Sequence, residues 1–357
     1  MRRHHPENEL AKRNYLDWLA HAHGRDAATL DQVAAALHRF EAFTGFASFK
    51  SFRREQAVSF KRHLSDERSA STGKPLSKAS LFSICRALRM FFEWLSREPG
   101  YRRHVLIGDA AYFNVTENDA RIATASRERP APALEQVQRV ITSMPDRDLA
   151  DRRDRAVVAL ILLTGARDAA VASLRIKHVD LARGMLVQDS REVRTKRAKD
   201  IRTTFFPVGD DVEQIVRDWV RELTCEQDFG PDDPLFPASR PTLSREAGRS
   251  GLSRKGWTSA APIRAIFKRA FEAAGLPYYP PHSLRKTLVR RAYDLDLGVR
   301  EMKAWSQNLG HSSMLTSLNS YGAVPAHEQE DLIRTAAHRM DDAFMREIAA
   351  VVKRRGY

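Results

Sequence analysis

Four short segments in the second half of the chain hold side chains able to act on a negatively charged group. Two are basic, Thr164-Gly165-Ala166-Arg167-Asp168 and Arg194-Thr195-Lys196-Arg197-Ala198-Lys199. The other two contain histidine, His282-Ser283-Leu284-Arg285-Lys286 and Leu309-Gly310-His311-Ser312-Ser313, and Tyr321 follows His311 by ten residues. Arginine and lysine neutralise anions, histidine moves protons, and a tyrosine hydroxyl is a nucleophile. Together these residue types are suited to group transfer at an anionic centre.

Each segment also has an ordinary structural explanation when it is taken singly. His282 could begin a helix that presents Arg285 to solvent, and His311 could be a buried core histidine. Tyr321 is one of eight tyrosines, and Lys196 lies in a basic run of the kind that often covers a solvated surface. The order of the four segments is therefore more informative than any one of them.

The net charge indicates a polyanionic partner. Lysine and arginine number 59 and aspartate and glutamate 45, which gives a formal net charge of +14 in 357 residues. The excess is shared equally by residues 1–130 and residues 131–357. Two basic halves suit a long polyanion that both of them contact, although charge alone is equally typical of a basic, soluble enzyme.

Composition excludes several classes of protein. Apolar residues make up 43% and charged residues 29%, as in globular chains. No apolar run approaches the ~20 residues needed to span a bilayer, and the N-terminus lacks the apolar stretch of a secretory signal. Two cysteines, Cys85 and Cys225, cannot build a disulfide framework or a cysteine-based zinc site. We expect a cytoplasmic protein of about two domains with no membrane partner.

The first half of the chain has the periodicity of a compact bundle of about four helices. Helical spacing of apolar residues predicts helices over 30–43, 54–65 and 77–95. We assign residues 1–110 to this domain. The following residues, 111–133, are largely polar and end in Pro130-Ala131-Pro132, which predicts a stiff, extended linker.

The second half mixes helices with a small amount of strand. Helices are predicted over 134–143, 154–164, 211–223, 260–275, 282–295, 299–308 and, with an amphipathic pattern, 326–352. Alternating apolar and polar residues over 184–208 predict β-hairpins, and 228–257 has the composition of a loop. The predicted fold class is mainly α with a small β-hairpin sheet.

In their order along the chain, the four segments resemble the tyrosine recombinase (phage integrase) family. Leu162-Leu163-Thr164-Gly165-Ala166-Arg167 is similar to the family's first arginine box, and Pro281-His282-Ser283-Leu284-Arg285-Lys286-Thr287 to its second. Leu309-Gly310-His311-Ser312-Ser313 is similar to the histidine box that precedes the nucleophile. The resemblance covers about 134–340 and, more loosely, 10–105.

The resemblance implies a two-domain tyrosine recombinase architecture. Residues 1–110 would form a helical core-binding domain and 111–133 a linker that crosses the DNA. Residues 134–325 would form the α/β catalytic domain. The segment 326–357 would either pack on its own domain or dock on a neighbouring protomer.

The family's chemistry implies a role for each residue. Tyr321 would attack the scissile DNA phosphate, forming a 3′-phosphotyrosyl link without metal or other cofactor. Arg167 and Arg285 would contact the non-bridging oxygens, since a guanidinium matches phosphate in a bidentate manner. His282 and His311 would hydrogen-bond the phosphate and assist proton movement.

The resemblance also implies a role for a lysine, and the sequence differs from the family pattern in two places. Lys196 corresponds to the first lysine of the family's hairpin and would protonate the leaving 5′ oxygen, with Lys199 as the alternative. Ala170 stands where the family often has an acidic residue. The ten-residue step from His311 to Tyr321 is one longer than the common spacing.

Double-stranded DNA at a specific recombination site is the implied partner, bound by a homo-oligomer that is a tetramer on DNA. Basic residues on predicted helix faces are candidates for phosphate contacts, although a solvated helix face explains each of them equally well. These candidates are Lys78, Arg86, Arg89, Arg264, Lys268 and Arg269.

Three functions share these features. The first is a site-specific recombinase or integrase of a mobile genetic element. The second is a DNA-binding relative of the same fold that no longer cuts, which Ala170 and the ten-residue spacing motivate. The third is a type IB topoisomerase-like enzyme. The helical N-terminal domain and the complete set of site residues favour the recombinase.

Overall fold

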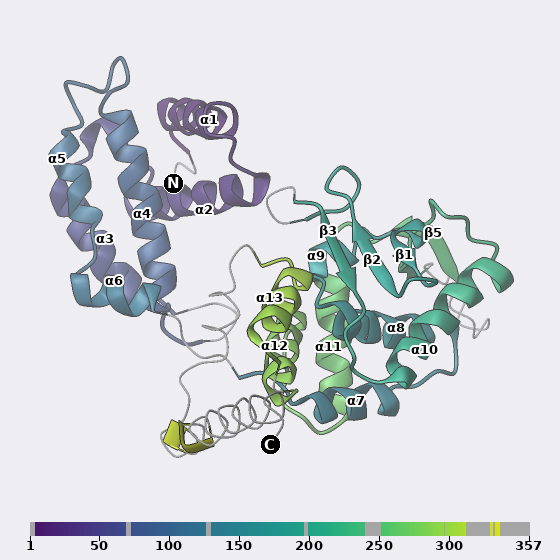
Figure 1. The fold of residues 1–357 in the computed structure, drawn as a ribbon. Helices are drawn as coiled ribbons and strands as arrows, with labels where there is room; N and C mark the ends of the chain where they lie inside the picture. Colours follow the sequence, from purple (N-terminus) through teal and green to yellow (C-terminus); the bar gives the residue numbers. More distant parts are fainter. Residues whose placement is uncertain are drawn as a thin grey trace, which may run out of the picture. The chain divides into compact units, whose positions relative to one another are not determined.

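The structure, a computed structural model, divides into two compact units, Met1–Arg127 and Glu128–Tyr357, each with its own hydrophobic core (Figure 1). It describes residues 4–68, 73–125, 130–195, 199–239, 251–295, 297–311, 329–330 and 333–335. The fold is mainly α-helical with small sheets, as the sequence predicted. No helix among the described residues is long and apolar enough to cross a membrane.

The first unit is a helical bundle around a core rich in phenylalanine. Its elements are α1 (Pro6–His21), α2 (Ala27–Phe43), η1 (Phe49–Ser51), α3 (Arg54–Asp66), α4 (Lys78–Leu95), α5 (Ile107–Ala110), η2 (Ala111–Phe113) and α6 (Glu117–Thr124). Phe52 and Phe92 stack at the centre, with ring centroids 3.8 Å apart. The predicted helices over 54–65 and 77–95 lie within one residue of α3 and α4 at each end.

The segment expected to be an extended linker, 111–133, differs from that expectation. Its first half forms η2 and α6, and α6 packs against α4. The Thr116 side chain caps α6 by accepting a hydrogen bond from the Asp119 backbone at 3.1 Å. Asp119 also forms an ion pair with Lys78 of α4, at 2.9 Å. A capped helix with acidic residues in its first turn is stable there without a strong apolar pattern, which is why periodicity did not predict it.

The second unit contains most of the helices and both sheets. Its helices are α7 (Leu134–Ser143), α8 (Leu149–Thr164), α9 (Asp168–Val171), η3 (Ile176–His178), α10 (Asp210–Arg221) with the π-helical turn η5 (Glu222–Glu226), α11 (Ala261–Ala273), η6 (Pro281–Ser283), α12 (Leu284–Asp294) and α13 (Val299–Asn308). The strands β1 (Val179–Asp180), β2 (Met185–Gln188) and β3 (Ile201–Thr204) form an antiparallel sheet in that order. Helices α12 and α13 lie side by side, and α13 contacts β3 (Figure 1).

Helix α8 is the centre of this unit, because every residue from Ala156 to Thr164 is buried. It begins five residues before the predicted start at 154. Asp148 caps the extra turn by accepting a hydrogen bond from the Asp151 backbone at 2.8 Å. This first turn is polar, so the apolar pattern did not reveal it. A helix buried on all sides holds its C-terminal end, and the segment that follows, in a fixed place.

Two further regions differ from the sequence prediction or lie beyond it. The stretch 228–257, predicted as a loop, contains β4 (Pro237–Ser239) and β5 (Leu252–Gly256), which pair antiparallel. These strands are short and irregular in register, so they give no usable alternation. Most of the predicted helix 326–352 lies outside the described residues, although residues 329–330 and 333–335 are helical.

Candidate active site

The first arginine segment is held by a tight glycine turn at the end of α8. Gly165 has φ +59°, a conformation that favours glycine, and its backbone N–H donates to the Ile161 carbonyl at 2.8 Å. A Cβ atom built on Gly165 would lie 2.7 Å from Leu309 Cδ2 and 3.1 Å from Leu288 Cδ1. The turn therefore packs directly on α12 and on the histidine segment. Arg167 follows at the start of α9, half-buried.

Arg285 joins three of the four segments. It is 5% exposed. Its Nη1 donates to the Gly165 carbonyl at 2.6 Å, and its Nη2 donates to the Leu309 carbonyl. Burial, together with the neighbouring charge of Arg167, lowers the pKa of Arg285 to about 10. The guanidinium thus stays charged at neutral pH while it holds the glycine turn and the histidine segment together.

His311 lies where the positive charges of the site converge. It is half-buried, and its pKa is lowered to about 4. Burial is the largest cause, followed in decreasing order by the charges of Arg285, Arg167, His282 and Lys199. His282 is the exposed residue of the turn η6, between buried Pro281 and Ser283, and it precedes Arg285 by three residues. These four described neighbours are basic residues, so the centre is suited to an anion.

The histidine segment is also fastened to the sheet. The side-chain amide of Asn308 pairs with the β3 backbone: its Oδ1 accepts from Thr204 N and its Nδ2 donates to Thr204 O, both at 2.8 Å. A Cβ atom on Gly310 would lie 3.1 Å from Ile201 Cδ1, so this backbone approaches β3 closely. Because β3 begins two residues after Lys199, Asn308 fixes His311 relative to the lysine segment.

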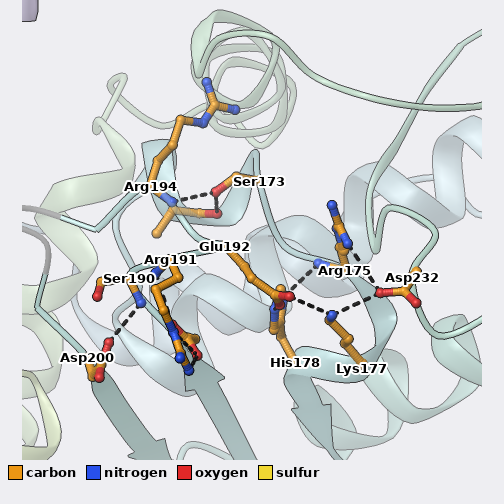
Figure 2. Close-up of polar contacts among 12 residues, drawn as sticks. Ser173, Arg175, Lys177, His178, Ser190, Arg191, Glu192, Arg194, Asp200 and Asp232 are labelled. Atoms are coloured by element: carbon orange, nitrogen blue, oxygen red, sulfur yellow. Dashed lines mark hydrogen bonds and ion pairs between the residues drawn. The ribbon is translucent and has the colours of Figure 1, made fainter.

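The loop between β2 and β3 is anchored to neighbouring elements at its base (Figure 2). Glu192 bonds His178 Nε2 at 2.9 Å and Lys177 Nζ at 2.8 Å. His178 Nδ1 accepts from the Arg175 backbone, so Nε2 carries the proton and donates to Glu192. Across the loop, Asp200 accepts a hydrogen bond from the Ser190 backbone at 2.8 Å.

The structure brings Arg167, His282, Arg285 and His311 together, and the charge of Lys199, the alternative to Lys196, also acts on His311. Lys196 and Tyr321 lie outside the described residues. Ala170 is 1% exposed. Periodicity did not predict Asn308 or the anchors of the β2–β3 loop, because contacts of single polar side chains leave no repeating pattern.

Most of the predicted DNA contacts are engaged with carboxylates of their own unit. Among the described residues, the pairs are Lys78–Asp119 (2.9 Å), Arg89–Glu93 (2.7 Å), Arg264–Asp168 (2.7 Å), Lys268–Glu272 (3.9 Å) and Arg269–Asp154 (2.9 Å). Arg86 is exposed on α4. A phosphate would have to compete with these carboxylates, so the contacts with DNA stay predictions.

Known sequences place the chain in a family. Residues 133–327 match the phage integrase family. The chain is 25% identical over 335 residues to tyrosine recombinase XerD of Corynebacterium glutamicum, a match that covers 92% of this chain and 98% of that protein. It is 26% identical over 253 residues to tyrosine recombinase XerC of Ralstonia pickettii, covering 69% of each.

Solved structures share the fold. A lambda integrase dimer bound to a COC′ core site matches with a TM-score of 0.60 at 16% identity, covering 89% of this chain and 97% of that one. The Tn1549 transposon integrase in complex with a circular intermediate DNA matches with a TM-score of 0.58 at 14% identity, covering 91% and 99%. The chain belongs to the phage integrase family, which confirms the predicted family and the tyrosine recombinase class of enzyme.

Replacing Gly165 tests how tightly the arginine turn packs on the histidine segment. We expect Gly165→Ala to lower the free energy of unfolding by about 1–3 kcal/mol, because the methyl group meets Leu309 and Leu288 in a backbone conformation that disfavours alanine. Gly184→Ala is the matched control, since Gly184 has the same φ of +59° but its nearest neighbour, Phe205, lies at 3.6 Å. Urea unfolding measures both variants. Equal losses would contradict the packing argument.

Proposed function

We propose that this protein is a site-specific tyrosine recombinase that cleaves and rejoins DNA strands through a 3′-phosphotyrosyl intermediate. The observation that carries the proposal is the convergence of Arg167, Arg285, His282 and Lys199 on His311. The chain's relationship to the XerC and XerD recombinases supports it. This combination favours a recombinase over a topoisomerase-like enzyme or a non-cutting relative.

The chemistry assigned to the site is a reversible phosphoryl transfer. The Tyr321 hydroxyl oxygen attacks phosphorus and passes its proton to a neutral histidine of the site, His282 or His311, while the bond from phosphorus to the 5′ oxygen breaks. The leaving 5′ oxygen takes a proton from a lysine of the β2–β3 loop. Attack by a 5′-hydroxyl then reverses these steps and rejoins a strand. The phosphodiester bond energy is kept in the protein–DNA link throughout.

The cations of the site perform the electrostatic part of the reaction. Arg285, held by two carbonyls, and Arg167 stabilise the charge that builds on the non-bridging oxygens in the transition state. His311 is neutral at physiological pH in the free protein, since its pKa is about 4. A bound phosphate offsets the surrounding positive charge and raises that pKa. His311, with His282, then hydrogen-bonds the phosphate and assists proton transfer.

The partner assigned to the protein is double-stranded DNA carrying a specific recombination site. We assign residues 1–110 to core binding, 111–133 to the connection and 134–325 to catalysis. The lambda integrase neighbour is a dimer on its core site, and we extend this to a tetramer in which 326–357 docks on a neighbouring protomer. Recombination of a mobile element in the cytoplasm is the setting that fits these assignments.

Covalent trapping tests the nucleophile. A nicked suicide duplex from the element's own junction, mixed with protein in EDTA, should give a protein–DNA adduct on a denaturing gel, because guanidinium groups supply the charge stabilisation. Tyr321→Phe should bind the duplex with unchanged affinity and give no adduct. An adduct that persists in Tyr321→Phe would show that another residue is the nucleophile. Loss of the wild-type adduct in EDTA would contradict metal-free chemistry.

A modified leaving group distinguishes Lys196 from Lys199. We prefer Lys196 as the acid because of its position in the hairpin. The charge of Lys199 lowers the pKa of His311, which supports Lys199 as the alternative. Replacing the acid with methionine should slow cleavage by about 10²–10⁴-fold. A substrate with sulfur at the bridging 5′ position should restore the rate, because a thiolate leaves without a proton. In the variant of the other lysine, the rate relative to wild type should be similar for the oxygen and the sulfur substrate. If sulfur restores the rate in neither variant, a lysine is not the acid.

A further inference from the structure

Arg194 lies in the basic run of the β2–β3 loop, yet its donors are engaged with protein. Its Nη1 donates to the Thr258 carbonyl at 2.6 Å and its Nη2 to the Trp257 carbonyl at 2.8 Å (Figure 2 shows the side chain extending away from the strands). Its backbone N–H donates to Ser173 Oγ at 2.9 Å. One residue thus ties the loop to two separate segments.

Both segments that Arg194 binds adjoin helices next to the candidate active site. Ser173 follows α9, which Arg167 precedes as the N-cap residue, and its Oγ donates to the Ala170 carbonyl at 2.8 Å. Trp257 and Thr258 lead into α11, whose Arg264 pairs with Asp168 at 2.7 Å. Arg194 therefore connects the loop to both sides of the arginine turn.

The loop has a second anchor, so its base is fixed on two sides. Glu192 bonds His178, which is 3% exposed, and Lys177, while Asp200 accepts from Ser190 at the loop's other end (Figure 2). These contacts fix both ends of the loop that carries Lys199. The charge of Lys199 acts on His311, so this lysine lies near the reacting centre.

We propose that Arg194 is a positioning residue that holds the β2–β3 loop so that its lysine stands at the leaving 5′ oxygen. The inference rests on the proposed function and extends it to a residue whose guanidinium donates to protein carbonyls. The other explanation is that Arg194 is a phosphate contact in a basic loop. An experiment can distinguish these two roles of Arg194, because a positioning residue affects only the step in which the lysine donates its proton.

The test compares oxygen and sulfur at the bridging 5′ position of the suicide duplex, with Arg194→Met and full-length protein. Cleavage of the oxygen substrate should slow by at least about tenfold, since general acid catalysis contributes about 10²–10⁴-fold. Cleavage of the sulfur substrate should stay near the wild-type rate. Affinity for the duplex at low and high salt should not change.

Arg191→Met is the matched control, because Arg191 lies in the same loop and pairs only with nearby Asp189 among the described residues. It should leave both cleavage rates unchanged. Arg194→Lys keeps the positive charge but loses the guanidinium that donates from two nitrogens. This variant should therefore retain its affinity for DNA and cleave the oxygen substrate, but not the sulfur substrate, somewhat more slowly than wild type.

Two results would overturn the inference. Equal slowing on both substrates, with weaker binding and a shallower salt dependence, would make Arg194 a phosphate contact. A rate equal to that of Arg191→Met would show that the loop needs no such anchor. Failure of the proposed function is a different outcome, since wild-type protein would then give no Tyr321-dependent adduct with either substrate.

Discussion

The site depends on one buried guanidinium. Arg285 is almost fully removed from solvent, and the free energy needed to bury a charge is several kcal/mol unless strong hydrogen bonds compensate. Two main-chain carbonyls, of Gly165 and Leu309, provide charge-assisted hydrogen bonds but no negative charge. The arginine is therefore held rigidly, and no carboxylate among the described residues forms an ion pair with it. In the proposed function a DNA phosphate balances this charge, so the contacts that build the fold would also prepare the chemistry.

The surrounding structure follows from this arrangement. Gly165 must lack a side chain because the turn that offers its carbonyl packs against Leu309. Asn308 joins the histidine segment to β3, and the anchors of the β2–β3 loop extend the same frame to the lysines. Hydrogen bonds and packing contacts thus connect segments that are distant in sequence. Preorganised charge of this kind is suited to phosphoryl transfer, where the enzyme stabilises charge more than it rearranges bonds.

The sequence predicted the features that leave a pattern. Helical periodicity located α3, α4 and α13 within one residue, and the order of the arginine and histidine boxes identified the family. The sequence did not predict the contacts of single polar side chains, because such contacts depend on which backbone segment the fold brings next to each side chain. The Arg194 guanidinium, part of a basic run in the sequence, binds the carbonyls of Trp257 and Thr258. For the same reason, sequence alone did not foresee the carboxylate partners of the basic helix faces.

The pKa of His311 tests most directly whether the site is a centre of unbalanced positive charge. Histidine-labelled Tyr321→Phe protein, titrated by NMR with His311→Gln to assign the signal, reports that pKa with and without the duplex. We expect a value near 4 in the free protein, far below the ordinary 6.5, because burial and the nearby cations disfavour the charged ring. We expect this pKa to rise clearly when the duplex binds, because the phosphate favours the charged ring. A pKa near 6.5 that the duplex does not change would show that the site holds no unbalanced positive charge.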